Sequence, residues 1–191
     1  MQQAAIQIIK SEHRSIAAVL QGLVHFTRAL ERGGPISDCK VLRAMLYYLD
    51  VFSERLHHPK EDHYLFSRVF QRTREAEDII SRLEDDHARG EDKIRHLMQS
   101  VIRLECGGEA YIREFSDSVS NYAEFHWRHM GLEEDVVIPL AQRVLNEDDW
   151  HAINAAFADN VDPLSGIDTK KDMNKLFASI VNLAQSPARI P

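Results

Sequence analysis

The stretch Arg55-Leu56-His57-His58-Pro59-Lys60-Glu61-Asp62-His63 decides how the rest of this 191-residue sequence is interpreted. It places histidines and carboxylates within a few residues, inside a run that otherwise reads as a long helix. His57 and Glu61 are four residues apart, so on a helix they lie one above the other on the same face. An imidazole and a carboxylate that point the same way suit iron, manganese or zinc.

The same His-x-x-x-Glu spacing occurs at two further places, and a single histidine lies on the apolar stripe of an earlier helix. The candidate ligands are therefore His13, His57, Glu61, His87, Glu91, His129 and Glu133. Each falls on the apolar stripe of its predicted helix, where an unpaired carboxylate would cost several kcal/mol. Bound cations would offset that cost. Four imidazoles and up to three carboxylates are too many for one ion, and they suit two ions with bridging carboxylates.

The spacing leaves some alternatives open. His58 with Asp62 is a second pair, rotated by about 100° from His57. We prefer His57 because Glu61 and Tyr64 continue the predicted buried stripe.

Two further histidine and carboxylate assignments also stay open. Glu134, five residues after His129, could replace Glu133 if the helix is locally distorted. His126, one turn before His129, is either a ligand or a neighbour of one. The remaining histidines, at positions 25, 63, 96 and 151, are expected on the surface or in packing roles.

Helical periodicity with glycine-containing breaks predicts an all-α fold. Long helices are expected over about 2–31, from Ser37 or Asp38 through at least Tyr64, over about 74–104, and over about 109–145. Pro59 predicts a kink just before it. Short connections favour an up-down-up-down four-helix bundle over 1–145. Residues 146–191 are expected to form a C-terminal helical extension packed on the bundle, with helices from Asn146 to about 158 and over about 168–184.

The composition narrows the function class. A net charge of −7 argues against a nucleic-acid partner, which needs a basic face. The two cysteines form no CxxC motif, so a disulfide framework is not expected. There is neither a leader-like N-terminus nor a long apolar run, so we expect no membrane span and a cytoplasmic location.

The motifs resemble, in order and spacing, those of the hemerythrin-like HHE cation-binding family over about residues 5–145. The carrying stretches are Glu12-His13, His57-His58-Pro59-Lys60-Glu61-Asp62, Asp86-His87-Ala88-Arg89-Gly90-Glu91 and His129-Met130-Gly131-Leu132-Glu133-Glu134. The resemblance implies a four-helix bundle that holds two iron ions, bridged by two carboxylates and an oxo or hydroxo group. It would make Glu61 and Glu133 the bridges. It would make His13, His57, His87 and His129 terminal ligands. Manganese and zinc also suit this set of donors.

The sequence departs from oxygen-carrying hemerythrins at one position. Those proteins have two histidines four apart on the third helix, whereas the second position here is Glu91. If Glu91 binds, its charge favours ferric iron; if it does not, one iron keeps an open position. Simple oxygen storage is therefore disfavoured in either case.

The expected function is binding or reduction of a small oxidant, such as dioxygen, nitric oxide or peroxide, as in relatives linked to nitrosative and oxidative stress. The alternative is an iron- or oxygen-sensing or storage module without turnover, with the C-terminal extension as its output surface. A separate redox partner and a homodimer are both compatible with this expectation.

Overall fold

The computed structural model describes residues 2–34, 36, 39–160, 162–164 and 178, and these form helices without a strand. Consecutive helical segments join into long helical rods. The first rod is α1 (Gln2–Glu31). The second rod comprises α2 (Lys40–Tyr48), η1 (Leu49–His57), α3 (His58–Lys60), η2 (Glu61–Phe66) and α4 (Ser67–Arg72). The third is α5 (Glu77–Gly107). The fourth comprises η3 (Gly108–Tyr111), α6 (Ile112–Leu132), η4 (Glu133–Val137) and α7 (Ile138–Val144).

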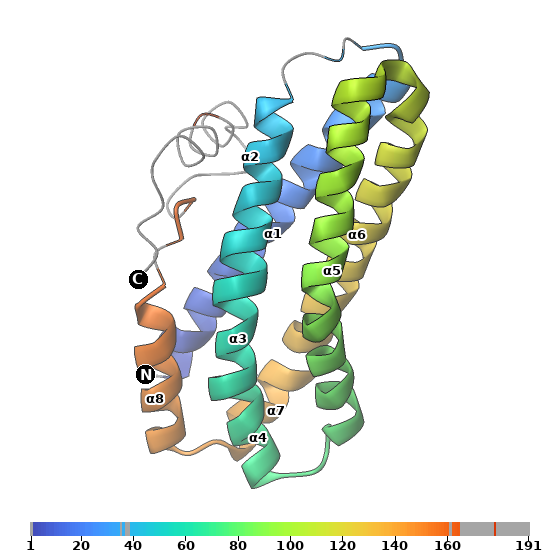
Figure 1. Ribbon diagram of the computed structural model, residues 1–191. Helices are drawn as coiled ribbons and strands as arrows, with labels where there is room; N and C mark the ends of the chain where they lie inside the picture. Colours follow the sequence, from blue (N-terminus) through green and yellow to red (C-terminus); the bar gives the residue numbers. More distant parts are fainter. Residues whose placement is uncertain (1, 35, 37–38, 161, 165–177, 179–191) are drawn as a thin grey trace.

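These four rods run up and down alternately, and α8 (Glu147–Ala158) packs beside α1 (Figure 1). The predicted all-α, up-down-up-down bundle is therefore confirmed. The predicted helix over 168–184, like Ser37 and Asp38, lies outside the described residues. None of the described helices combines the length and the apolar character that a bilayer span requires.

The start of α8 follows directly from its sequence. The Asn146 side chain accepts a hydrogen bond from the Asp149 backbone N–H at 2.9 Å, and the Asp149 carboxylate accepts one from the Asn146 N–H at 3.1 Å. This reciprocal capping box satisfies two backbone donors that a helix start leaves unpaired. The predicted start at Asn146 agrees with it.

Pro59 does not break the second rod. Pro59 lies in the short α3 segment, and wider π-helical turns lie on both sides of it, with the His58 N–H donating to the Ser53 carbonyl. A π turn adds a residue per turn, so it accommodates the missing proline donor and rotates the residues that follow. Leu65 is consequently buried and Tyr64 is 37% exposed. The prediction that Tyr64 continues the buried stripe is wrong for this reason.

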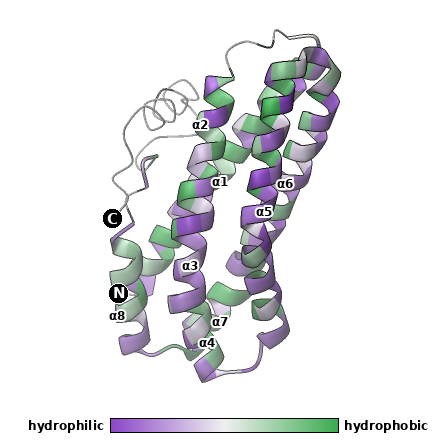
Figure 2. Cartoon of the chain, in the orientation of Figure 1, coloured by the Kyte–Doolittle hydropathy of each residue, from purple (hydrophilic) through white to green (hydrophobic). Residues whose placement is uncertain are grey.

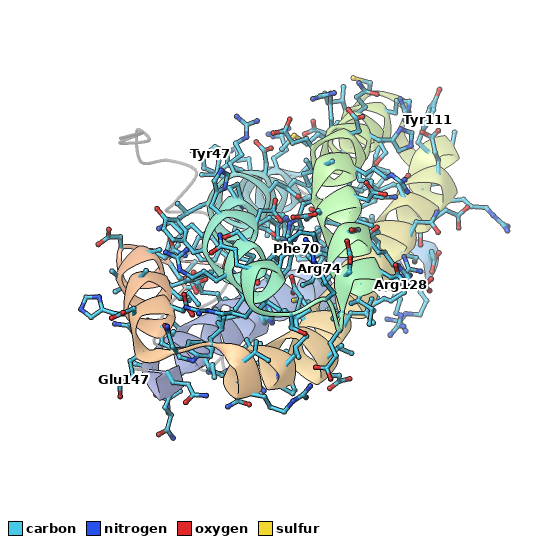
Figure 3. All side chains as sticks on the ribbon, turned by 90° about the horizontal axis from the view of Figure 1, so that it is seen from below. Tyr47, Phe70, Arg74, Tyr111, Arg128 and Glu147 are labelled. Atoms are coloured by element: carbon cyan, nitrogen blue, oxygen red, sulfur yellow. The ribbon has the colours of Figure 1, made fainter. Side chains whose placement is uncertain are left out.

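The hydrophobic core is divided into two clusters along the bundle axis. One contains residues such as Leu20, Met45, Leu97 and Phe115, and the other contains residues such as Ile9, Phe66, Ile80, Ile153 and Phe157. Each helix mixes hydrophilic and hydrophobic residues along its length (Figure 2). Seen from below, side chains fill the space between the rods, and Arg74 packs over the Phe70 ring at 3.7 Å where α4 leads into α5 (Figure 3). A buried polar layer lies between the two clusters.

Candidate metal centre

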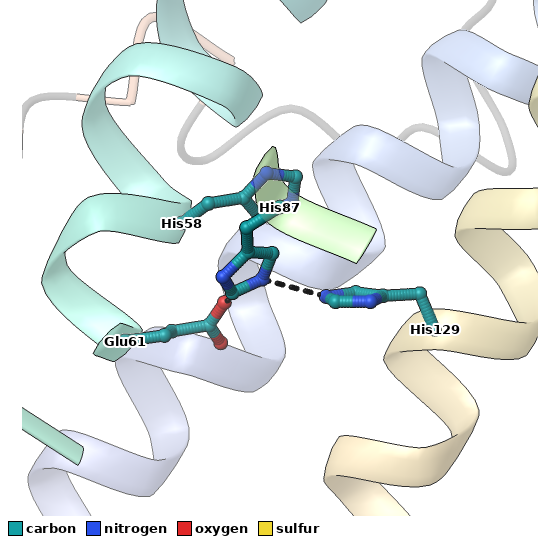
Figure 4. Close-up of side chains that lie close together, drawn as sticks. All are labelled: His58, Glu61, His87 and His129. Atoms are coloured by element: carbon teal, nitrogen blue, oxygen red, sulfur yellow. Dashed lines mark hydrogen bonds and ion pairs between the residues drawn. The ribbon is translucent and has the colours of Figure 1, made fainter. Parts of the chain in front are cut away.

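The polar layer brings together side chains from all four rods. They are His13 of α1, His57 of η1, Glu61 of η2, His87 of α5, His129 of α6 and Glu133 of η4, and each is at most 9% exposed. Their donor atoms form two overlapping groups, within which all atoms lie within 4.8 Å of one another: His13, His57 and Glu61, and His58, Glu61, His87 and His129. Figure 4 shows the second group, with His87 and His129 facing one another.

Glu61 presents one carboxylate oxygen to each group. Its Oε1 lies 3.5 Å from His13 Nε2 and 3.3 Å from His57 Nε2. Its Oε2 lies 3.7 Å from His87 Nε2. Glu61 therefore spans the two histidine pairs, as a bridging carboxylate would.

Glu133 has the same arrangement from the opposite side of the bundle. Its Oε2 lies 3.4 Å from His13 Nε2, and its Oε1 lies 3.0 Å from His129 Nε2 and 3.8 Å from His87 Nε2. The Nε2 atoms of His87 and His129 are themselves 2.8 Å apart. Two imidazoles bound to one cation at about 2.1 Å each would have a similar separation.

The donor atoms at the centre fit cations better than they fit each other. Among the described residues, the Nε2 atoms of His13 and His57 and both carboxylate oxygens of Glu61 and Glu133 have no hydrogen-bond partner. Buried polar atoms are normally paired, because an unpaired one loses its hydration without compensation. Cations bound between these atoms would satisfy them together, and the nitrogen and oxygen donors suit iron, manganese or zinc.

Each histidine of the centre has a carboxylate beside its other ring nitrogen, Nδ1. The pairs are His57 with Glu12 at 2.7 Å, His87 with Asp62 at 2.7 Å, His13 with Glu134 at 2.9 Å and His129 with Asp86 at 3.7 Å. A carboxylate that accepts the Nδ1 proton fixes the ring and leaves Nε2 free to bind a metal. Glu134 thus lies behind His13, while Glu133 faces the centre.

The acidic surroundings change the proton affinities of the histidines. Burial alone lowers the pKa of a histidine, but Glu134, Glu61 and Glu133 outweigh it and raise the pKa of His13 to about 9. Asp62, Glu133 and Glu61 likewise outweigh burial and raise the pKa of His87 to about 10. Without a metal, protons on these rings therefore balance the charge of the carboxylates, and a cation must displace them.

Glu91 does not reach the centre. Its carboxylate is 62% exposed and lies 4.0 Å from Arg95. The inward position of α5 after His87 is Gly90, and a Cβ built there would come within 2.0 Å of Glu54 Oε2. The Glu54 carboxylate from the second rod therefore occupies the space into which a ligand after His87 was expected to point.

Glu54 organises a second buried polar cluster beside the centre. It accepts hydrogen bonds from the Tyr122 hydroxyl at 2.6 Å and from His58 Nδ1 at 3.0 Å, and its Oε1 lies 3.1 Å from His126 Nε2. The other ring nitrogen of His58 is 3.4 Å from Ser53 Oγ, and its ring stacks on that of His87 at 4.2 Å. Both nitrogens of His58 thus have partners, whereas His57 keeps Nε2 free. His126 contacts Glu54, so it lies behind the centre.

The orienting role of these carboxylates was not predicted from the sequence. Asp62 and Glu134 were considered only as alternative metal ligands, and Glu12, Asp86 and Glu54 were assigned no role. A signal for the orienting carboxylates is present, because each motif carries an acid directly beside a candidate ligand: Glu12-His13, Glu61-Asp62, Asp86-His87 and Glu133-Glu134. Adjacent residues on a helix point about 100° apart, so such an acid faces a neighbouring rod instead of the centre. In the structure each one meets a histidine from that rod.

Comparison with known proteins agrees with the geometry. A family model described as the hemerythrin HHE cation binding domain matches residues 4–141, which include the whole centre and end before α8. No curated protein matches the chain. The chain therefore belongs to the hemerythrin HHE cation-binding family.

Proposed function

We propose that this chain is a non-haem di-iron protein that binds or reduces a small oxidant: dioxygen, nitric oxide or peroxide. The observation that carries the proposal is the pair of carboxylates, Glu61 and Glu133, each of which offers an oxygen to both histidine pairs. One ion between His13 and His57 and another between His87 and His129 would satisfy every unpaired donor of Glu61 and Glu133. Bound iron would supply redox and Lewis-acid chemistry.

The ligand count supports reactivity at the metal. Two histidines and two shared carboxylates would give each ion four protein donors, whereas iron commonly takes six ligands, so positions would remain for an exogenous molecule. The exposed position of Glu91 favours this arrangement over one in which a third carboxylate fills the site. The chain's own part is to hold the imidazoles in register and to keep bulk water away, since the six donors lie buried between two apolar clusters.

A sensing module without turnover is the second candidate. It is favoured by the contact of Asn160, just after α8, with the carboxylate that orients His57, because a change at the metal could alter the packing of this segment. We expect a diatomic gas or peroxide as the small-molecule partner in either case. A separate redox partner is expected only where there is turnover.

Iron analysis with optical spectroscopy tests the proposal. Protein purified from iron-replete cells should contain about two irons per chain and absorb in the near ultraviolet when ferric. Many turnovers of peroxide or nitric oxide would indicate an enzyme. A single stoichiometric spectral change would indicate a sensor or carrier. Protein that takes up no iron under anaerobic reconstitution would contradict the di-iron proposal.

A further inference from the structure

The segment that follows the family-matched range reaches the metal centre through one side-chain amide. Asn160 Nδ2 donates a hydrogen bond to Glu12 Oε1 at 2.9 Å, and the other oxygen of Glu12 accepts from His57 Nδ1 at 2.7 Å. The family range ends at residue 141, so Asn160 lies outside it. The chain Asn160–Glu12–His57 therefore links this segment directly to a candidate ligand.

The orientation of the Asn160 amide is fixed by its two partners. Lys60 Nζ donates to Asn160 Oδ1 and also to the Ala156 carbonyl at 2.7 Å. A lysine ammonium can only donate and an ionised carboxylate can only accept, so the amide oxygen must face Lys60 and the amide nitrogen must face Glu12. Lys60 directly precedes Glu61, so the second rod contributes to holding the amide in place.

Apolar and polar contacts hold the segment around Asn160 against the bundle. Phe157 is fully buried, and its ring meets the His57 ring edge-on with centroids 6.1 Å apart. The Asp162 carboxylate accepts a hydrogen bond from the Tyr48 hydroxyl at 3.1 Å, and the next described turn buries Leu164. Asn160 is thus fixed from both sides along the chain.

The orientation of the Glu12 carboxylate depends on its hydrogen bond with Asn160, because Glu12 lies at the edge of a surface pocket. Its side chain is 3% exposed and borders a surface pocket of about 370 Å³, which Phe157 and Asn160 also line. A carboxylate with a donor on each oxygen is held in one orientation, whereas loss of the outer donor would leave it free to turn towards the water in the pocket. His57 would then lose the partner that fixes its ring.

We propose that Asn160 is a positioning residue of the metal centre, and that the packing of the 147–160 segment and occupancy of the His13/His57 end are coupled through Glu12. Because coupling between two sites is reciprocal, metal binding should stabilise this segment as much as the segment stabilises the metal. The inference rests on the proposed occupancy by two metal ions. It gives the segment a function beyond that of the family domain.

Metal release from the full-length chain tests this proposal. We would load the wild type, Asn160→Asp, Asn160→Ala and Asn160→Gln with ferrous iron and follow its loss to a chelator. The Asn160→Asp variant keeps the side-chain size and the hydrogen bond with Lys60, but it places a second carboxylate next to that of Glu12. It should speed release of one of the two ions by about 10- to 100-fold, the range known for partners that orient metal-bound histidines. The other ion should leave at the wild-type rate. Asn160→Gln, which keeps the amide, should restore part of the retention.

Asn154→Asp is the matched control. It makes the same chemical change on α8 at a half-buried residue whose side chain forms no hydrogen bond or ion pair with other described residues, and it should release both ions as the wild type does. Hydrogen exchange of the peptide that covers 147–160 gives the reciprocal readout. Exchange should slow on metal loading in the wild type, and this difference should shrink in Asn160→Ala.

The possible results distinguish failure of the Asn160 inference from failure of the di-iron proposal. Equal release rates in all five proteins would overturn the inference and leave the di-iron proposal intact. Hydrogen-exchange rates in α8 that are the same with and without metal would do so as well. A wild-type chain that holds no iron would overturn both. If the coupling is observed but the protein reacts with no oxidant, the inference about Asn160 is supported and the proposed reaction is contradicted.

Discussion

At one end of the centre Glu12 lies 2.7 Å from His57, whereas at the other end the corresponding carboxylate, Asp86, lies 3.7 Å from His129. Glu12 has Asn160 on its second oxygen, while Asp86 Oδ2 has no hydrogen-bond partner among the described residues. The two ends nevertheless share one design. The acid-histidine pair of α1 corresponds to that of α5, and both His-x-x-x-Glu-acid motifs lead into π-helical turns.

The difference between the ends comes from what surrounds the repeated motif. The His13/His57 end is covered by α8, with Phe157 against the His57 ring. The His87/His129 end adjoins the Glu54 cluster, with the His58 ring stacked on that of His87. The same local arrangement can therefore hold two ions with unequal strength.

Removing a carboxylate that both ends share should have the largest effect. In Glu61→Ala both ions lose a donor, and we expect iron content to fall from about two to well below one per chain, measured by elemental analysis. Glu91→Ala, the same change at an exposed position, should keep the wild-type content. Equal losses in both variants would show that Glu91 also binds metal.

Removing a histidine that belongs to one end should cost one ion. We expect His57→Ala and His129→Ala each to retain about one iron per chain, because each leaves the other histidine pair intact. His25→Ala, at an exposed position of α1, serves as the control and should retain both irons. Loss of both irons from either single variant would mean that the ends do not bind independently.

Metal affinity should rise with pH at both ends of the centre. Metal-free His13 and His87 carry protons below their pKa values of about 9 and about 10, and a cation must release them. Each ion should therefore bind about tenfold more tightly per pH unit for each proton it displaces. The contribution of His13 should level off near pH 9 and that of His87 near pH 10. At the His13/His57 end, His57 adds a further proton, because Glu61 and Glu12 outweigh burial and raise its pKa well above the ordinary value. Titration with a coloured competing chelator at several pH values would measure the metal affinity. An affinity that does not change with pH would contradict the protonation of His13 and His87 in the metal-free protein.

The orienting carboxylates should show the smallest effects and the most direct contrast. Glu12→Gln should weaken metal binding at its end by about 10- to 100-fold, since a short charged hydrogen bond to His57 is lost. Asp86→Asn should weaken binding by less than about tenfold, because the contact it removes is already long. Competitive titration of the two variants measures both effects. A larger effect for Asp86→Asn would reverse the proposed order of the two ends.

Much of this architecture follows from the sequence. Helical periodicity predicted α1 over 2–31, and the capping residue Asn146 started α8 as expected. The apolar stripe of the first helix indicated His13, and the His-x-x-x-Glu spacing indicated His57, Glu61, His87, His129 and Glu133, which the structure brings together. Periodicity works here because a buried stripe must repeat with the helix turn. Whether these side chains bind iron stays a prediction until the metal is measured.

The positions that could not be predicted depend on features that regular helical spacing does not describe. Placing Tyr64 on the buried stripe assumed α-helical spacing across Pro59, and the π turns around Pro59 rotate Tyr64 outward. Placing Glu91 at the centre assumed that the fourth residue after His87 points inward, whereas Gly90 does so. The contact between Asn160 and Glu12 joins residues far apart in the chain, and no spacing rule predicts such a pair.

Anomalous diffraction from iron-loaded crystals of the full chain, measured at the iron edge, would locate both ions. We expect two peaks in the buried polar layer. One should lie about 2 Å from the Nε2 atoms of His13 and His57, the other equally close to those of His87 and His129, with Glu61 and Glu133 between them. A single peak, or peaks bound by Glu91 or His126 in place of these histidines, would contradict the proposed di-iron centre.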